Sequence, residues 1–311
     1  MKIYTHNFNP TSNSGPNKFT RQLFRKMECN NNIGFVDDQQ SADIEFCLIQ
    51  QQSHKVKPMA LRLDGIWFNS DQDYKQQNAP IKLAYENADA VIFQSQFNKQ
   101  LTEHWFGLHE NAHVIHNGAD VEMITSVSKS TFGYPMINPQ IEVWSCASSW
   151  RPHKRLGENI RYFVEQSPPT AILIVAGNGM RREDIETFEH LLNDRIFLVG
   201  ELDYSNLLSL YKRSTTFVHL AYLDHCPNVV VDAQACGCKI ICSKSGGTNE
   251  IVSNGIVIVE KPWDFAPIKL YQPPKLDFNL KYELSHTYKK GEEPCIANCA
   301  KKYYNIMEKM L

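Results

Sequence analysis

The sequence has no long hydrophobic run: none approaches the roughly 20 apolar residues that a membrane-spanning helix requires. It also has no surplus of either charge, because 32 Lys and Arg stand against 34 Asp and Glu, and the formal net charge is −2. A dedicated nucleic-acid binder normally carries a basic surplus, so we expect no nucleic-acid partner. The amino-terminal residues lack the apolar stretch of a signal peptide, which favours a cytoplasmic location.

Cysteine is sparse, and its spacing does not indicate a metal site. Nine cysteines occur in 311 residues, which is too few for a disulfide scaffold, and the number is odd. The densest group, Cys236, Cys238 and Cys242, contains no C-x-x-C pair, and Cys295 and Cys299 do not form one either. We therefore expect buried, reduced thiols and no metal site.

The sequence does contain a regular alternation of short apolar runs and helical patterns. Predicted strands occupy 44–49, 59–63, 90–94, 113–116, 141–146, 171–176, 195–199, 216–220, 239–242 and 256–259. Predicted helices lie around 19–27 and 97–105, the second with Ser95 as its cap, and at 156–165, 182–192, 204–213, 227–235 and 248–252. This alternation is typical of the α/β class, with parallel sheets covered by helices on both faces.

Two domains are expected from the break in this pattern. Residues 126–139 combine Gly, Pro, Ser and Asn without a clear period, which predicts a linker. We therefore predict two Rossmann-like, doubly wound domains at 1–130 and 131–284. Residues 285–311 end in an amphipathic pattern that predicts a last helix.

A cationic turn follows the strand predicted at 141–146. Arg151, Lys154 and Arg155 lie within five residues, just before a predicted helix. The positive end of the helix dipole adds to these charges, so the turn is a candidate clamp for a diphosphate. The alternative is a solvated basic turn of no function.

Two carboxylates flank the start of the helix predicted at 227–235. Pro227 fits the first helical position, so Asp224 lies just before the helix and Asp232 more than a turn inside it. Carboxylates accept hydrogen bonds from the vicinal hydroxyls of a sugar or a ribose. Taken singly, each residue is equally well explained as a cap-region or an exposed helix carboxylate.

Three further segments follow predicted strands or precede helices. Gly246 and Gly247 form a strand-to-helix turn in which the backbone can approach a ligand closely, although such turns are common. Residues 11–17, which include Gly15, have the composition of a loop over a ligand or of a plain surface loop. Arg62 and Asp64 stand at a strand end, where the alternative to a site is an internal salt bridge.

Together these segments resemble the retaining glycosyltransferases of family 4, within glycosyl transferases group 1. Residues 224–252 are similar to that family's signature E-G-F-P-N-V-V-L-E-A-M-A-C-G … S-x-x-G-G-x-x-E-I-V, and 149–156 to its basic motif. Residues 88–95 and 114–120 resemble its amino-domain strand and its interdomain lead-in. The segments occur in the family's order over roughly residues 1 to 260, which is more specific than any single motif.

The resemblance implies a GT-B fold, in which two Rossmann-like domains face a cleft and the last helix packs back on the first domain. It implies transfer of a sugar from a nucleoside diphosphate sugar with retention of anomeric configuration, without a required metal and with no cofactor besides the donor. The acceptor stays open among a glycan, a lipid-linked sugar and a small molecule, and so does the oligomeric state. Family members often act on lipid-linked acceptors, so a peripheral position at a membrane also stays open.

By position, the resemblance assigns Lys154 to the donor diphosphate, Asp224 to the donor sugar and Asp232 to the ribose. The catalytic set that it implies is Lys154, Asp224 and Asp64. The donor-binding set that it implies is Gly15, Arg151, Arg155, Asn228, Val229, Asp232, Gly246 and Gly247.

The chain also departs from the family pattern. Asp224 and Asp232 stand where the family has glutamates, and Ser149 stands where it has an arginine, so Arg151 and Arg155 are the candidates to supply that charge. Two rival classes remain. One is another enzyme of the same architecture, such as a nucleotide-sugar epimerase or a phosphorylase, and a phosphorylase would consume free phosphate. The other is a non-catalytic protein that binds a sugar nucleotide or a partner.

Overall fold

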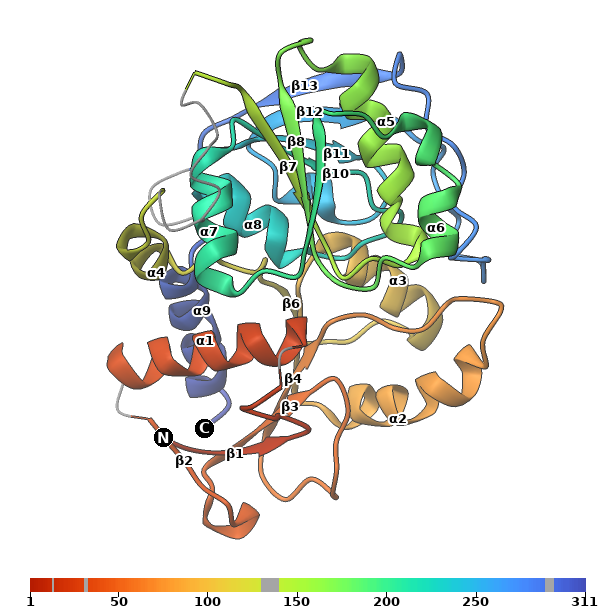
Figure 1. Cartoon of the computed structure of the whole chain (residues 1–311). Helices are drawn as coiled ribbons and strands as arrows, with labels where there is room; N and C mark the ends of the chain where they lie inside the picture. Colours follow the sequence, from red (N-terminus) through yellow and green to blue (C-terminus); the bar gives the residue numbers. More distant parts are fainter. Residues whose placement is uncertain (13, 31–32, 130–139, 289–293) are drawn as a thin grey trace. The chain divides into compact units, whose positions relative to one another are not determined.

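The chain folds into two compact units, shown in the computed structural model of Figure 1, which describes all residues except 13, 31–32, 130–139 and 289–293. Unit 1 comprises Met1–Asp120, Asp264–Ile268 and Lys289–Leu311, and unit 2 comprises Val121–Trp263 and Lys269–Tyr288. The predicted domain boundary at 130/131 and most of the predicted linker 126–139 fall outside the described residues.

Unit 1 is built on a six-stranded parallel sheet in the order β2-β1-β3-β4-β5-β6. Its strands are β1 (Lys2–His6), β2 (Gly34–Phe35), β3 (Ile44–Leu48), β4 (Met59–Leu63), β5 (Ala90–Phe93) and β6 (Ala112–Val114). Strands β3 to β5 are fully buried and mostly apolar, which is why their sequences predict them. The sequence analysis missed β1, in which only Ile3 and His6 are buried.

Helices on both faces complete unit 1. They are α1 (Gly15–Asn30), the 3-10 turn η1 (Gln39–Ser41), α2 (Tyr74–Asn87), α3 (Gln96–Phe106) and α9 (Ile296–Glu308). The Ser95 cap is confirmed, since its hydroxyl accepts from the Asn98 amide. The last helix, α9, packs beside α1, and the two helices share one hydrophobic core with β1, β3 and β4 (Figure 1).

Unit 2 is built on a seven-stranded sheet in the order β13-β12-β11-β10-β7-β8-β9, parallel except for the β12–β13 pair. Its strands are β7 (Val143–Ala147), β8 (Ile172–Ala176), β9 (Ile196–Gly200), β10 (Thr216–His219), β11 (Lys239–Ser243), β12 (Asn254–Ile258) and β13 (Lys281–Ser285). The edge strand β13 is almost wholly exposed, so no apolar pattern predicts it.

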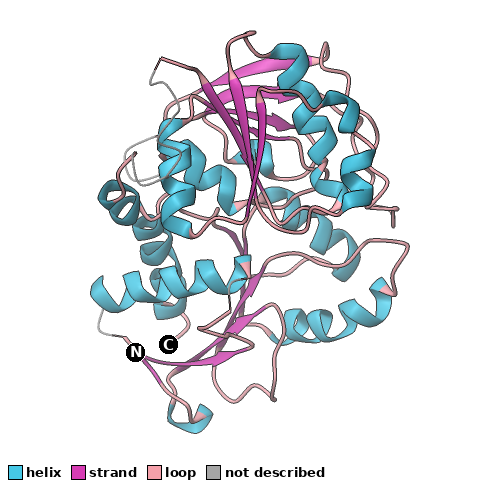
Figure 2. Ribbon diagram, in the orientation of Figure 1, coloured by secondary structure: helices cyan, strands magenta, loops and turns pink. Residues whose placement is uncertain are grey.

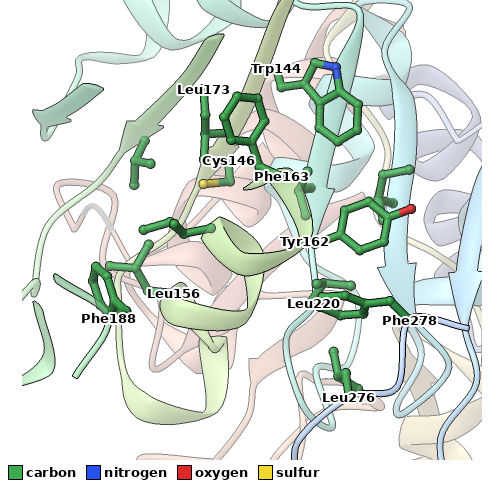
Figure 3. Packing of buried hydrophobic residues seen from close by; sticks show 14 of the residues in the cluster. Trp144, Cys146, Leu156, Tyr162, Phe163, Leu173, Phe188, Leu220, Leu276 and Phe278 are labelled. Atoms are coloured by element: carbon green, nitrogen blue, oxygen red, sulfur yellow. The ribbon is translucent and has the colours of Figure 1, made fainter. Parts of the chain in front are cut away.

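Figure 2 shows the helices that flank this sheet. They are α4 (Val121–Ser126), η2 (Pro152–Lys154), α5 (Leu156–Gln166), α6 (Arg182–Glu186), η3 (Glu189–Leu191), α7 (Tyr204–Arg213), α8 (Asn228–Ala235) and η4 (Thr248–Glu250). The prediction of one helix over 182–192 is wrong. The chain breaks between α6 and η3, where Phe188 turns into the core beside Leu156 (Figure 3). The predicted helix 248–252 is a single 3-10 turn.

Two further features bear on the sequence-based expectations. In the part of the chain that the structure describes, no helix is both long and apolar enough to cross a membrane. All nine cysteines lie in the described part of the chain; they form no disulfide, and six of them are buried.

A buried arginine ties α9 to the sheet of unit 1. Arg62, near the end of β4, donates to the hydroxyl of Tyr303 on α9 at 2.7 Å and to the Asn117 side chain at 3.1 Å. Its guanidinium also lies 4.2 Å from the centre of the Phe19 ring on α1. The carboxyl-terminal helix therefore supports the strand end that carries Asp64.

We predict that Tyr303→Phe lowers the free energy of unfolding by about 1.5–3 kcal/mol, because a buried charged donor loses its acceptor. Chemical denaturation of the whole chain measures this loss. Tyr304→Phe is the matched control, since the Tyr304 hydroxyl bonds to the exposed Glu308, and its removal should leave stability unchanged. Equal losses in the two variants would contradict the role given to Arg62.

Candidate functional site

The polar residues that the sequence singles out in unit 2 lie at one edge of its sheet. Because β7, β8, β10, β11 and β12 are parallel, the loops that follow them meet at their shared carboxyl edge. The backbone links these loops: the Trp150 amide donates to the Asn178 carbonyl, and the Tyr222 amide to the His153 carbonyl. The edge is therefore a connected surface of loops held by a rigid sheet.

Lys154 and Asp224 form an ion pair at this edge. The Lys154 ammonium lies 2.5 Å from Oδ2 of Asp224, although the two residues are 70 positions apart in the chain. His219, the last residue of β10, approaches the same Oδ2 through its Nε2 at 2.9 Å. The second oxygen, Oδ1, accepts from the backbone amide of His225 at 3.1 Å.

The electrostatics of this group keep the carboxylate charged. Burial by itself raises the pKa of Asp224, but the Lys154 ammonium and the His219 hydrogen bond outweigh it and hold that pKa well below its usual range. Burial lowers the pKa of His219, and Asp224 offsets this only in part, so the ring is neutral near pH 7. An ionised carboxylate only accepts hydrogen bonds, so the Nε2 of His219 carries the proton.

Two other histidines near the pair contribute no charge near pH 7. Burial lowers the pKa of His153 to about 3 and that of His225 to about 4. His153 stacks on the ring of Tyr271, with the ring centres 5.6 Å apart. The positive charge of the edge therefore comes from lysine and arginine.

The glycine turn predicted from the sequence packs directly on Asp224. The Gly247 amide donates to the Asp224 carbonyl at 2.7 Å, and Gly246 pairs with Asp224 as an isolated β-bridge. A Cβ on Gly246 would lie 2.3 Å from the carbonyl oxygen of Asp224, and its φ of +78° is one that glycine adopts freely. Leu223 also has a left-handed φ, +55°, so strain is stored immediately before Asp224.

Arg155 has a different environment from the other two cations of the basic turn. Its guanidinium makes a two-armed ion pair with Glu260, at 2.9 and 2.7 Å, and donates to the carbonyls of Leu220 and Pro274. Ser245 donates to the same Glu260 at 2.8 Å. Arg155 is thus buried in a network that joins the loops after β7, β11 and β12, and no local sequence pattern predicts this network.

Arg151, by contrast, is exposed, and no carboxylate partner is found for it among the described residues. It lines a cavity of about 230 Å³ in unit 2, together with Trp150, Leu156 and Met180. Of the three cations in the turn, Arg151 is the one whose charge is not already neutralised.

The remaining donor-binding residues predicted in unit 2 lie on α8. Asn228 and Val229 are its first two residues, and Pro227 is its cap rather than its first helical residue. Asp232 is buried one turn further along, near enough to Tyr211 on α7 to add to the effect of burial in raising the pKa of that hydroxyl. The structure thus brings the start of α8 and Asp224 together at the carboxyl edge.

Asp64 and Gly15 belong to unit 1. Asp64 forms an ion pair with Arg62 at 2.7 Å, so the internal salt bridge weighed in the sequence analysis exists. Burial raises the pKa of Asp64, and Arg62 offsets this only in part. Gly15 is the first residue of α1. The roles that the family resemblance assigns to these two residues stay predictions.

A family model covers the segment that carries the site. Residues 146–266 match the model described as "Glycosyl transferases group 1". Unit 2 contains a group 1 glycosyltransferase domain. Lys154, Asp224, Asp232, Gly246 and Gly247 all lie inside the matched segment.

Curated relatives of this group 1 domain are distant. An uncharacterised glycosyltransferase of Methanocaldococcus jannaschii is 25% identical over 182 residues, which are 56% of this chain and 45% of that protein. A GDP-mannose-dependent monoacylated alpha-(1-6)-phosphatidylinositol monomannoside mannosyltransferase of Corynebacterium glutamicum is 23% identical over 188 residues, 55% of this chain and 49% of that protein. The chain thus spans about half the length of these relatives.

Solved glycosyltransferases share the whole fold. The UDP-glucose complex of Anabaena HepE matches with a TM-score of 0.65 at 16% identity, over 100% of this chain and 98% of that one. Sucrose-phosphate synthase of Thermosynechococcus elongatus matches with a TM-score of 0.66 at 13% identity, over 100% and 96%. At identities this low, the structural matches establish the fold alone, and that fold is GT-B. The α/β prediction of two Rossmann-like domains is confirmed. The narrower assignment to family 4 stays a prediction.

Two residues of the group 1 domain site were not predicted from the sequence, His219 and Glu260, and Ser245 was noted only as part of the glycine turn. His219 ends a predicted strand, so the rule that ligands meet the carboxyl ends of strands could have found it. Ser245 adjoins the glycine pair. Glu260 follows β12 as an ordinary surface-type residue, and only the fold pairs it with Arg155.

We predict that Gly246→Ala destabilises the chain by about 1–3 kcal/mol more than Gly200→Ala, because only the first variant forces a Cβ into the Asp224 backbone. Gly200 is the matched control. Its φ of +73° is nearly the same, and its Cβ would meet nothing within 4 Å. Thermal and chemical unfolding of both variants give the difference, and equal losses would show that the turn does not press on Asp224.

Proposed function

We propose that the protein is a retaining, metal-independent glycosyltransferase that moves a sugar from a nucleoside diphosphate sugar to an acceptor. The observation that carries the proposal is the Lys154–Asp224 pair, which lies beside the start of α8 inside the matched glycosyltransferase segment. The relatives add support: Anabaena HepE was solved with UDP-glucose, and the Corynebacterium relative is named for GDP-mannose.

Lys154 and Arg151 are proposed to hold the donor diphosphate. An ammonium has three N–H donors, of which Asp224 takes one, so Lys154 can bind phosphate oxygens without leaving its partner. The first turn of α8, which begins at Asn228 and Val229, adds backbone N–H donors and the positive end of a helix dipole. Arg155 is not part of this proposal, because Glu260 and two carbonyls already occupy it.

Asp224 is proposed to accept hydrogen bonds from donor sugar hydroxyls, and Asp232 from the ribose. Asp224 stays ionised because its pKa is held low, so it is an acceptor at neutral pH. The glycine turn holds the backbone of Asp224: the Gly247 amide donates to its carbonyl, and Gly246 pairs with it as an isolated β-bridge. Asp232 lies on the same helix whose start faces the proposed phosphates, which suits the order sugar, diphosphate and ribose along the donor.

The chemistry follows from charge. As the sugar leaves, negative charge develops on the diphosphate, and Lys154, Arg151 and the α8 amides stabilise it in place of a metal ion. A covalent route would need a free carboxylate nucleophile. Asp224 is a poor one, since two donors hold its Oδ2 and its pKa is low. We therefore propose attack by the acceptor on the face that the diphosphate leaves, with a phosphate oxygen taking the acceptor proton.

A thermal-shift panel of UDP-glucose, UDP-N-acetylglucosamine, GDP-mannose and ADP-glucose tests the donor class. A ligand that binds only the folded state raises the free energy of unfolding by mass action, by about 2.7 kcal/mol at 100 times its Kd. The melting temperature rises with it. At least one member is expected to raise it more than its free nucleoside diphosphate does. A flat panel would contradict the proposal, and consumption of free phosphate would indicate a phosphorylase.

We predict that Lys154→Ala removes most transfer, by 100-fold or more at about 1.36 kcal/mol per factor of ten, while the melting temperature without ligand changes little. The reason is that its partner Asp224 keeps the bonds from the His219 ring and from the His225 amide. Transfer, or donor hydrolysis when no acceptor is known, is followed by nucleoside diphosphate release. Near-wild-type release by this variant would refute the role of Lys154.

We predict opposite behaviour for the two arginines of the turn. Arg151→Ala weakens nucleoside diphosphate binding and leaves stability intact, because the side chain is exposed. Arg155→Ala lowers the free energy of unfolding by about 3–5 kcal/mol, because it leaves Glu260 buried and unpaired. Calorimetric titration and chemical denaturation of both variants measure the contrast. A stable Arg155→Ala protein that fails to bind would reverse the assignment.

A further inference from the structure

The carboxylate of Asp224 is held asymmetrically. Two side-chain donors, Lys154 at 2.5 Å and His219 at 2.9 Å, converge on Oδ2, whereas Oδ1 accepts from the backbone amide of His225 at 3.1 Å. A carboxylate oxygen offers two lone-pair sites, so Oδ1 keeps acceptor capacity that Oδ2 has used.

His219 is the more rigid of the two donors. It is 4% exposed and ends β10, where its backbone pairs in register with Cys242 of β11. Its ring lies parallel to that of Phe217 at 6.4 Å, with 12° between the planes. Lys154 has a long, flexible side chain, and a lysine that binds phosphate shares its N–H donors between the phosphate and Asp224.

We propose that His219 is a positioning residue: its Nε2–H fixes Oδ2 of Asp224 so that Oδ1 is presented to a hydroxyl of the donor sugar while Lys154 is free to engage the diphosphate. This inference rests on the proposed function and goes beyond it by naming the group that orients the sugar acceptor. The fixed donor keeps Asp224 ionised and aimed when the lysine shares its protons with a phosphate.

The other titratable groups near Asp224 do not replace His219 as the fixed donor to Oδ2. The titratable groups that face Asp224 and His219 are Lys154 and His153 from η2 and His225 from the loop before α8, with Glu250 of η4 acting on His225 and Arg151 on His153. His153 and His225 are neutral near pH 7 because burial lowers their pKa values to about 3 and about 4. The side chains that hydrogen-bond to the Asp224 carboxylate are those of Lys154 and His219.

A pH effect follows with a definite sign. The hydrogen bond from His219 lowers the pKa of Asp224, so its loss raises that pKa. A protonated Asp224 no longer accepts from the sugar. Donor affinity in a variant without the bond should therefore fall as the pH falls, over a range in which the wild type is constant.

The experiment compares His219→Phe, which keeps the ring volume and removes the donor, with His219→Gln, whose amide nitrogen can reach Oδ2. The probe is the sugar nucleotide of the panel that stabilises the wild type most, titrated calorimetrically from pH 5 to pH 8. Its phosphates carry no proton that titrates in this range. Free nucleoside diphosphate, titrated at pH 7.5 only, shows how much of the affinity comes from the sugar.

We expect His219→Phe to lose about tenfold or more of the affinity for the sugar nucleotide at pH 7.5 while binding the free nucleoside diphosphate normally. Its affinity should fall further toward pH 5, and His219→Gln should restore both the affinity and the flat profile. Parallel losses of stability and affinity in the two variants, with flat profiles, would show a merely structural role and overturn the inference.

A readout without ligand separates this inference from the proposed function. Nitrogen-15 spectra of the histidine rings, with His219 assigned by its absence in His219→Gln, should show a ring that is neutral and protonated at Nε2 near pH 7 and that titrates below the usual range of histidine. A ring protonated at Nδ1, or one that titrates near pH 6.5, overturns the inference whatever the donor does. The expected spectrum with a flat ligand panel leaves the hydrogen bond in place and refutes the glycosyltransferase proposal.

Discussion

The ion pair between Lys154 and Asp224 is the interaction on which the chemistry of unit 2 depends. It joins two loops 70 residues apart and leaves each partner with unused bonding capacity: N–H donors on the lysine and one lone-pair oxygen on the aspartate. A cation and an acceptor side by side match a ligand in which a diphosphate is bonded to a sugar. Because the pair is mostly buried, its charges act in a lower dielectric than they would on an open surface.

The pair keeps its place because the loops around it are fixed from several sides. The bridge between Gly246 and Asp224, and the bond from the Gly247 amide, hold the aspartate backbone. Arg155 and Glu260 fasten the loop before α5 to the loops after β11 and β12. The strained φ of Leu223 is tolerated only because these contacts over-determine the turn. A preorganised site of this kind suits stabilisation of charge that develops on a leaving group.

The sequence predicts the buried strands of both sheets and the residues that follow them, because apolar runs and strand-end motifs are local signals. It misses β1 and β13, whose side chains are mixed or exposed. It treats Arg155 as equivalent to Arg151, since charge in a turn says nothing of burial, and the Glu260 partner lies 105 residues away. The strand-end rule could have found His219, but not its bond to Asp224, because that bond depends on how the loop after β10 turns back.

The central claim is that Lys154 grips a diphosphate while Asp224 binds the sugar attached to it. The most direct test is a crystal structure of the chain with the sugar nucleotide that stabilises it most. The account predicts the Lys154 ammonium within hydrogen-bond distance of a diphosphate oxygen and Oδ1 of Asp224 within that distance of a sugar hydroxyl. A sugar nucleotide bound with both groups turned away from it would contradict the account.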